Sequence, residues 1–129
     1  MDGIGRLHVR VFTAQAQIPV AGATVVITRQ GGNGKRKLLS VQTTDSSGLS
    51  RPIAVESPGA GQSTQPGGRD PFAICTVWAE HPGYAMLRAD GVQIFPGVET
   101  VQEMELIPLV EGQDSLLRRQ DRWATAQNL

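Results

Sequence analysis

The sequence predicts an all-β protein: an antiparallel sandwich of about seven strands, followed by a C-terminal arm. Apolar residues recur at every second position in one segment after another, as they do where a strand buries one face. Short clusters of Gly, Pro, Asn, Asp and Ser separate these segments and are typical of turns. No window before Gly112 repeats its apolar residues with the 3.6-residue period of a helix. We therefore expect one domain over residues 1–110 and an arm over residues 111–129.

The alternation also predicts which side chains are buried. In the first segment Leu7, Val9 and Val11 alternate with basic residues, and the same period recurs along the chain. The expected core consists of Leu7, Val9, Val11, Ala23, Val25, Ile27, Leu39, Val41, Val77, Ala79, Met104 and Leu106. Short strands are expected at residues 53–55, 86–88 and 92–94, the last two separated by a turn at residues 89–91.

Charge and cysteine content exclude several classes of protein. The 129 residues include 12 Lys and Arg against 12 Asp and Glu, so the formal net charge is zero. Such a chain lacks the basic surface with which proteins bind nucleic acid. No apolar run approaches the ~20 residues that span a membrane. The single cysteine excludes an internal disulfide and a cysteine-built zinc site, and we expect no metal and no cofactor.

Five phrases of the sequence, taken in order, carry a family resemblance. They are GRLHVRVFTA (5–14), IPVAGATV (18–25), TTDSSGL (43–49), VWAEHPGY (77–84) and VQIFPGV (92–98). Together they resemble the carboxypeptidase-regulatory-like, or transthyretin-like, domain family over residues 6–109. The chain is most similar to short stand-alone members from spore-forming Gram-positive bacteria. The resemblance implies a transthyretin-like (prealbumin-like) fold that serves mostly as a passive module: a spacer, a stalk, a folding aid or a contact surface.

The motifs also have a physical interpretation. In the Thr-Asp-x-x-Gly phrase, Asp45 can accept hydrogen bonds from backbone amides while Gly48 takes a positive φ. The stretch from Gly31 to Lys35 is expected to form a hairpin turn, with Lys35, Arg36 and Lys37 on the solvated edge. Both phrases are turn signals, and neither predicts catalysis.

Catalytic relatives of this fold use site residues that this sequence largely lacks. The resemblance to 5-hydroxyisourate hydrolases rests on His8-Val9, but the C-terminal Tyr-Arg-Gly-Ser sequence of those enzymes is absent. Tyr84 is the only tyrosine, so the two-tyrosine iron site of intradiol dioxygenases cannot form. Cys75 has the core-facing parity of its strand and is expected to be unreactive. A hydrolase therefore remains only a remote alternative, and we expect no catalytic residues.

An interaction surface is the remaining candidate. Ile74 and Trp78 share the outward face of their strand, and Phe12 and Val26 are expected to point outward on theirs. A sheet face with such groups needs a cover. The arm carries further apolar residues that could provide one, namely Leu116, Leu117 and Trp123. Either a weakly amphipathic helix from Asp114 or an extended segment fits its sequence. We expect the arm to dock near Ile74 and Trp78, on its own domain or on a neighbouring copy.

The predicted function is that of a non-enzymatic structural or interaction protein. It would assemble into a homo-oligomer or filament, or dock on a spore or cell-envelope partner. The alternative is an accessory module that binds glycan or peptidoglycan, although the 5% aromatic content is low for sugar binding. Residues 57–70 are expected to form a long surface loop, either a binding loop or a tolerated insertion. The chain lacks a signal-peptide pattern, so we expect synthesis in the cytoplasm, with the spore or cell surface open as a destination.

Overall fold

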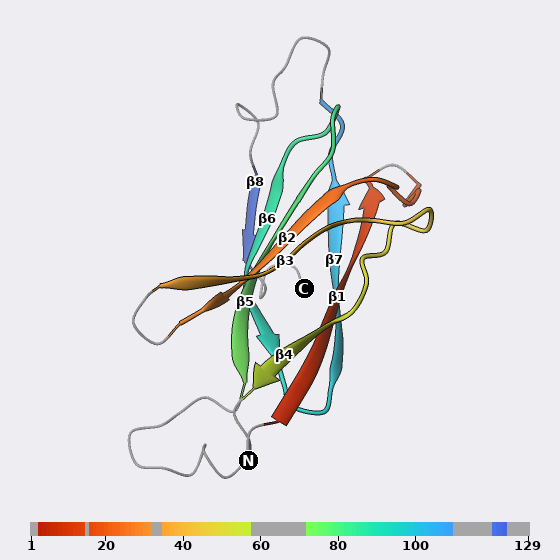
Figure 1. Cartoon of the computed structure of the whole chain (residues 1–129). Helices are drawn as coiled ribbons and strands as arrows, with labels where there is room; N and C mark the ends of the chain where they lie inside the picture. Colours follow the sequence, from red (N-terminus) through yellow and green to blue (C-terminus); the bar gives the residue numbers. More distant parts are fainter. Residues whose placement is uncertain (1–2, 15, 32–34, 58–71, 110–119, 124–129) are drawn as a thin grey trace.

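The computed structural model describes residues 3–14, 16–31, 35–57, 72–109 and 120–123, the last of these by their backbone alone. Within these residues the strands are β1 (Gly3–Thr13), β2 (Thr24–Gln30), β3 (Arg36–Thr43), β4 (Ile53–Ser57), β5 (Ala73–Glu80), β6 (Leu87–Ile94), β7 (Glu99–Leu106) and β8 (Gln120–Trp123). They form a three-stranded sheet of order β4-β1-β7 and a five-stranded sheet of order β3-β2-β5-β6-β8 (Figure 1). The predicted sandwich of seven strands is confirmed, and β8 belongs to the predicted arm.

Two pairs of strands depart from the antiparallel arrangement. β1 and β7 are parallel, with Arg6 opposite Glu99 and Thr13 opposite Leu106, and β6 and β8 are parallel as well. The other neighbouring strands pair antiparallel. Side chains alternate with the same period in both kinds of sheet, so the sequence pattern could not distinguish them. Over the described ranges there is no helix with the length and apolar content needed to cross a membrane.

The core lies between the two sheets and is built from their inward-facing side chains. The expected core is confirmed except at β3, where Leu39 is half-buried and Val41 is 60% exposed. The register between β2 and β3 shifts between Ile27 and Thr28, because β3 contains one extra residue there. This β-bulge reverses the parity of β3, so Val41 lies opposite the outward-facing Val26.

β6 contains the second correction. The predicted turn at residues 89–91 is wrong, because Leu87–Ile94 is one continuous strand. The register shifts from Cys75 opposite Val92 to Val77 opposite Ala89, which leaves one additional residue on β6. Gly91 has a φ of 72°, the left-handed conformation that favours glycine in such a bulge. The Asp90-Gly91 pair therefore bends a strand instead of reversing the chain, and Asp90 is buried.

The predicted turn at residues 45–48 has the expected geometry. Asp45 Oδ1 accepts hydrogen bonds from the amides of Ser47 (2.8 Å) and Leu49 (3.0 Å). Gly48 has a φ of 76°, and a Cβ atom there would collide with the carbonyl oxygen of Val11. The buried Thr44 hydroxyl donates to the Val20 carbonyl (2.6 Å), which joins the turn to the preceding connection. These contacts position the beginning of the segment that crosses to the other sheet.

Candidate functional site

The outward face of the five-stranded sheet carries a group of apolar side chains, here called the apolar face: Val26, Leu38, Val41, Ile74 and Trp78. Val26 lies opposite Val41 on one side and opposite Trp78 on the other, so these three form a row across the strands. Leu38 and Val41 are each 60% exposed, whereas Val26, Ile74 and Trp78 are half-buried. The predicted outward placement of Ile74 and Trp78 agrees with this register. Sequence reasoning missed Leu38 and Val41, because only the bulge in β3 brings them to this face.

A buried carboxylate adjoins the apolar face. Asp90 Oδ2 accepts hydrogen bonds from Arg88 through Nε (2.8 Å), and Nη2 of the same guanidinium lies 2.6 Å away. Its Oδ1 accepts a hydrogen bond from the Thr76 hydroxyl (3.0 Å) and lies 3.9 Å from Nη2 of Arg36. The Arg36 guanidinium in turn lies over the Trp78 ring, 5.7 Å from its centroid. The carboxylate thus orders two arginines around the only tryptophan whose side chain the structure describes.

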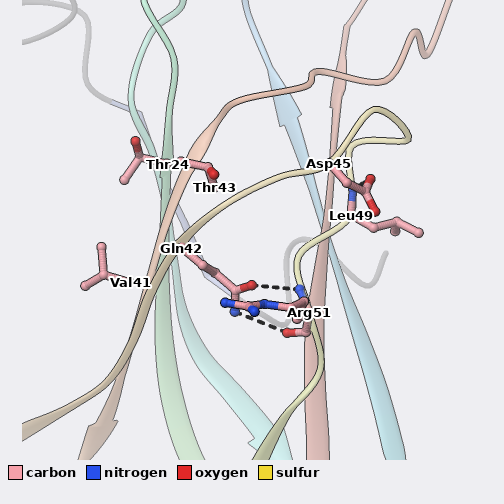
Figure 2. Close-up of a pocket in the computed structure, with 7 residues that line it drawn as sticks. All are labelled: Thr24, Val41, Gln42, Thr43, Asp45, Leu49 and Arg51. Atoms are coloured by element: carbon pink, nitrogen blue, oxygen red, sulfur yellow. Dashed lines mark hydrogen bonds between the residues drawn. The ribbon is translucent and has the colours of Figure 1, made fainter.

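A shallow groove continues from the apolar face around the edge of β3 (Figure 2). Its volume is about 560 Å³, and its lining residues are Thr24, Val41, Gln42, Thr43, Asp45, Leu49 and Arg51. Gln42 bridges the edge of β3 to the next segment, because its Oε1 accepts from the Arg51 amide (2.7 Å) and its Nε2 donates to the Arg51 carbonyl (3.1 Å). In Figure 2 the labelled side chains spread around the groove and do not converge on one point. The groove therefore suits an extended contact better than a small substrate.

The outward face of the three-stranded sheet is different in character, because it is charged. Arg10 Nη1 donates to Glu103 Oε2 across the β1–β7 pair (2.8 Å). His8 Nδ1 lies 3.2 Å from Glu99 Oε2, but without the alignment of a hydrogen bond. Phe12, which was expected on the surface, is only 6% exposed, and the Arg10 guanidinium lies 4.6 Å from its ring centroid. The exposed apolar residues of this face, Ile4 (56%) and Val101 (47%), lie among these charged side chains, whereas Val26, Val41 and Trp78 form a row on the five-stranded sheet.

The residues with catalytic potential lie apart. His8 is on the three-stranded sheet, whereas His81 lines a depression of about 380 Å³ at the end of the sandwich, with its ring 5.6 Å from that of Tyr84. None of the described residues lining this depression is Ser, Cys, Asp or Glu. Burial raises the pKa of the Cys75 thiol to about 11, while the nearby charge of Arg29 lowers it slightly. Among the described residues, no three His, Cys, Asp or Glu side chains gather at a metal-binding distance.

The predicted arm is described only in part. The backbone of Gln120–Trp123 forms β8, which pairs with β6 of the same chain over residues 87–90. This is the extended alternative for that segment, placed at a sheet edge. Leu116 and Leu117 lie outside the described residues, as do residues 58–70 of the predicted loop, whose first residue, Ser57, is buried at the end of β4. Docking of the arm on the apolar face, through Trp123 or the two leucines, stays a prediction.

No protein-family model matches the chain, and neither does any curated protein. Among solved structures, the Bacillus anthracis TIE protein is similar at 12% identity with a TM-score of 0.51, over 83% of this chain and 17% of that one. A sea bream transthyretin in complex with thyroxine is 12% identical over 84% of this chain and 98% of its own, with a TM-score of 0.45. A transthyretin from Sparus aurata is 12% identical over 78% and 89%, with a TM-score of 0.43.

The chain spans only 17% of the length of the TIE protein, so the similarity concerns one part of that molecule. The TM-score of 0.51 indicates a shared fold, and an identity of 12% carries no information about activity. The all-β sandwich predicted from the sequence is the architecture of this chain, and the matched part of the TIE protein shares that fold. The narrower resemblance, to carboxypeptidase-regulatory-like domains of spore-forming bacteria, stays a prediction.

Proposed function

We propose that this chain is a non-enzymatic interaction module and that the apolar face of its five-stranded sheet docks on a second copy of the chain. The observation that carries the proposal is the pair of neighbouring large apolar side chains, Leu38 and Val41, each 60% exposed on a face that already contains Val26 and Trp78. Contiguous apolar groups on an otherwise polar surface are typical of interaction sites.

A face-to-face contact is favoured over pairing through the edges of β3 or β7. The edge of β3 is bridged by the two hydrogen bonds between Gln42 and Arg51. The edge of β6 is occupied by β8. The edge strand β7 carries Glu99, Glu103 and Glu105, and charged side chains discourage the pairing of exposed edges. The outward face of β2, β3 and β5 has no such protection.

The apolar face can supply enough free energy for association. Burying the exposed 60% of Leu38 and of Val41 would contribute about 1 to 2 kcal/mol for each side chain. In a two-fold dimer each side chain is buried twice, and the remaining exposed surface of Trp78 adds to the sum. Such a contact would exceed the entropic cost of association by at most a few kcal/mol, so we expect a dissociation constant on the order of millimolar.

The test is sedimentation velocity of the full chain and of Val41→Glu. A glutamate on the apolar face should prevent association without unfolding the domain, because Val41 contributes little to the core. The matched control is Val101→Glu, since Val101 is 47% exposed on β7, on the charged face of the other sheet. The proposal is wrong if the unmodified chain shows no association at about 1 mM protein, or if both variants associate equally well.

Comparison of the full chain with a truncated chain separates the contribution of the arm from that of the apolar face. Truncation after residue 110 removes β8 and the predicted apolar residues of the arm. If the truncated chain stays folded and associates as before, the apolar face is sufficient. If association is lost while Val41→Glu has no effect, assembly depends on the arm, and the apolar face is not the interface.

The finer predictions on location and partner remain proposals. Docking on a spore or cell-envelope protein is supported by the sequence resemblance alone, and the same face would serve it. The glycan-binding alternative has weaker support, because Trp78 is half-buried and lies under the Arg36 guanidinium. Sugar platforms need an open aromatic ring.

A further inference from the structure

A separate cleft lies between the β2–β3 hairpin of one sheet and the edge strand β4 of the other. Its volume is about 210 Å³, and it is lined by Arg29, Lys37, Leu39, Ala54, Val55 and Glu56. Val55 is buried and Leu39 packs against the core, so the cleft has an apolar wall. Arg29 and Lys37 add two cationic side chains to the same space. None of these residues belongs to the apolar face.

The bulge in β3 places the two cations opposite each other. Arg29 follows the buried Ile27 by two residues and shares its inward parity. After the extra residue in β3, the register sets Lys37 directly opposite Arg29. Directly opposed like charges destabilise a sheet unless a counter-charge lies between them. Among the described residues, no carboxylate oxygen lies within 4.0 Å of either cation, although Glu56 lines the cleft.

We infer that this cleft binds a small carboxylate, with its charge between Arg29 and Lys37 and its carbon atoms against Leu39 and Val55. An arginine and a lysine in one concave site are the partners that an anionic group requires. The cleft has a volume of about 210 Å³. That space accommodates a carboxylate with a few carbon atoms. Either a free short-chain acid or the terminal carboxylate of a peptide has this chemistry.

The probes are therefore butyrate, the dipeptide acetyl-Ala-Ala with a free carboxylate, and the same dipeptide as its amide. Each is titrated at constant ionic strength while the amide chemical shifts of Leu39 and Val55 are followed by NMR. At least one of the two acids should give saturable shifts at millimolar concentration, and the amide should give none. Tighter binding of butyrate indicates a free acid, and tighter binding of the dipeptide indicates a peptide terminus.

Substitutions in the cleft test the assignment. Lys37→Met and Arg29→Gln should each weaken binding roughly tenfold, because each removes a charge-assisted contact. Lys35→Met is the matched control, since it makes the same change two residues away and outside the lining of the cleft. Glu56→Gln should tighten binding, because it removes a negative charge from the site. In low salt without ligand, Lys37→Met should raise the thermal midpoint, since it relieves the opposed charges.

Several results would overturn the inference. The inference is wrong if neither acid gives saturable shifts, or if the amide binds as well as the acid. It is also wrong if Lys35→Met weakens binding as much as Lys37→Met does. Finally, it is wrong if Glu56→Gln and Lys37→Met both lower the thermal midpoint. That result would mean that Glu56 already neutralises Lys37, so the cleft would not need an anionic ligand.

Discussion

Replacing Asp90 by asparagine tests whether the buried carboxylate stabilises the five-stranded sheet. The side chain of Asp90 is 7% exposed, and that of its main partner Arg88 is 23% exposed. Asparagine keeps the shape and can still accept the hydrogen bond from Thr76. It removes the negative charge that faces Arg88 at 2.6 Å and Arg36 at 3.9 Å.

The expected loss of stability follows from this geometry. Removing one partner of a fully buried ion pair costs about 3–5 kcal/mol. Arg88 is partly exposed and can regain some hydration, so we expect Asp90→Asn to lower the free energy of unfolding by about 2 to 3 kcal/mol. For a chain of this size that corresponds to a fall of roughly 8 to 12 °C in the thermal midpoint.

The assay is urea unfolding of Asp90→Asn beside the matched variant Glu103→Gln. Glu103 forms an ion pair of similar length with Arg10, 2.8 Å, but its side chain is 60% exposed. An exposed pair contributes at most about 1 kcal/mol. A double-mutant cycle with Arg88→Met should give a coupling energy of at least ~1 kcal/mol with Asp90→Asn. Equal losses in the two single variants, or a coupling near zero, would refute the reasoning.

Two further predictions concern the turn at residue 48 and the buried thiol. Gly48→Ala should destabilise the domain by well over the ~1 kcal/mol that a left-handed alanine costs, because its Cβ would collide with the Val11 carbonyl. Gly22→Ala, with a similar φ of 74° but open space around it, should cost only that ~1 kcal/mol, and equal losses in urea unfolding would contradict the expectation. The pKa of Cys75 is raised from 9.0 to about 11, so about 0.1% of the native thiol is ionised at pH 8. In the unfolded chain the ionised fraction at that pH is about 10%. Iodoacetamide should therefore label Cys75 at least a hundredfold more slowly in the native protein than in urea, and rapid native labelling would show that the thiol is accessible. The free energy of unfolding should fall as the pH rises from 9 toward 11, because the native state favours the protonated thiol.

The sequence by itself determined most of the strands and most of the core. The alternation at Leu7, Val9 and Val11 predicts a buried strand face because burial of every second side chain is a local property of a strand. The turn at Asp45 and Gly48 was predictable for the same reason, since its hydrogen bonds lie within five residues. The burial of Cys75 followed from its parity.

Only the tertiary structure decided which side chains meet on the surface. Asp90-Gly91 has the composition of a turn, and it forms a bulge because β5 continues to pair on both sides of it. The bulge in β3 moves Val41 onto the apolar face and sets Lys37 opposite Arg29. A bulge forms where one strand has an extra residue relative to the strand it pairs with, so the sequence of one strand alone does not predict it. The faces and the cleft on which the proposed functions rest therefore depended on register between distant segments, which local alternation does not encode.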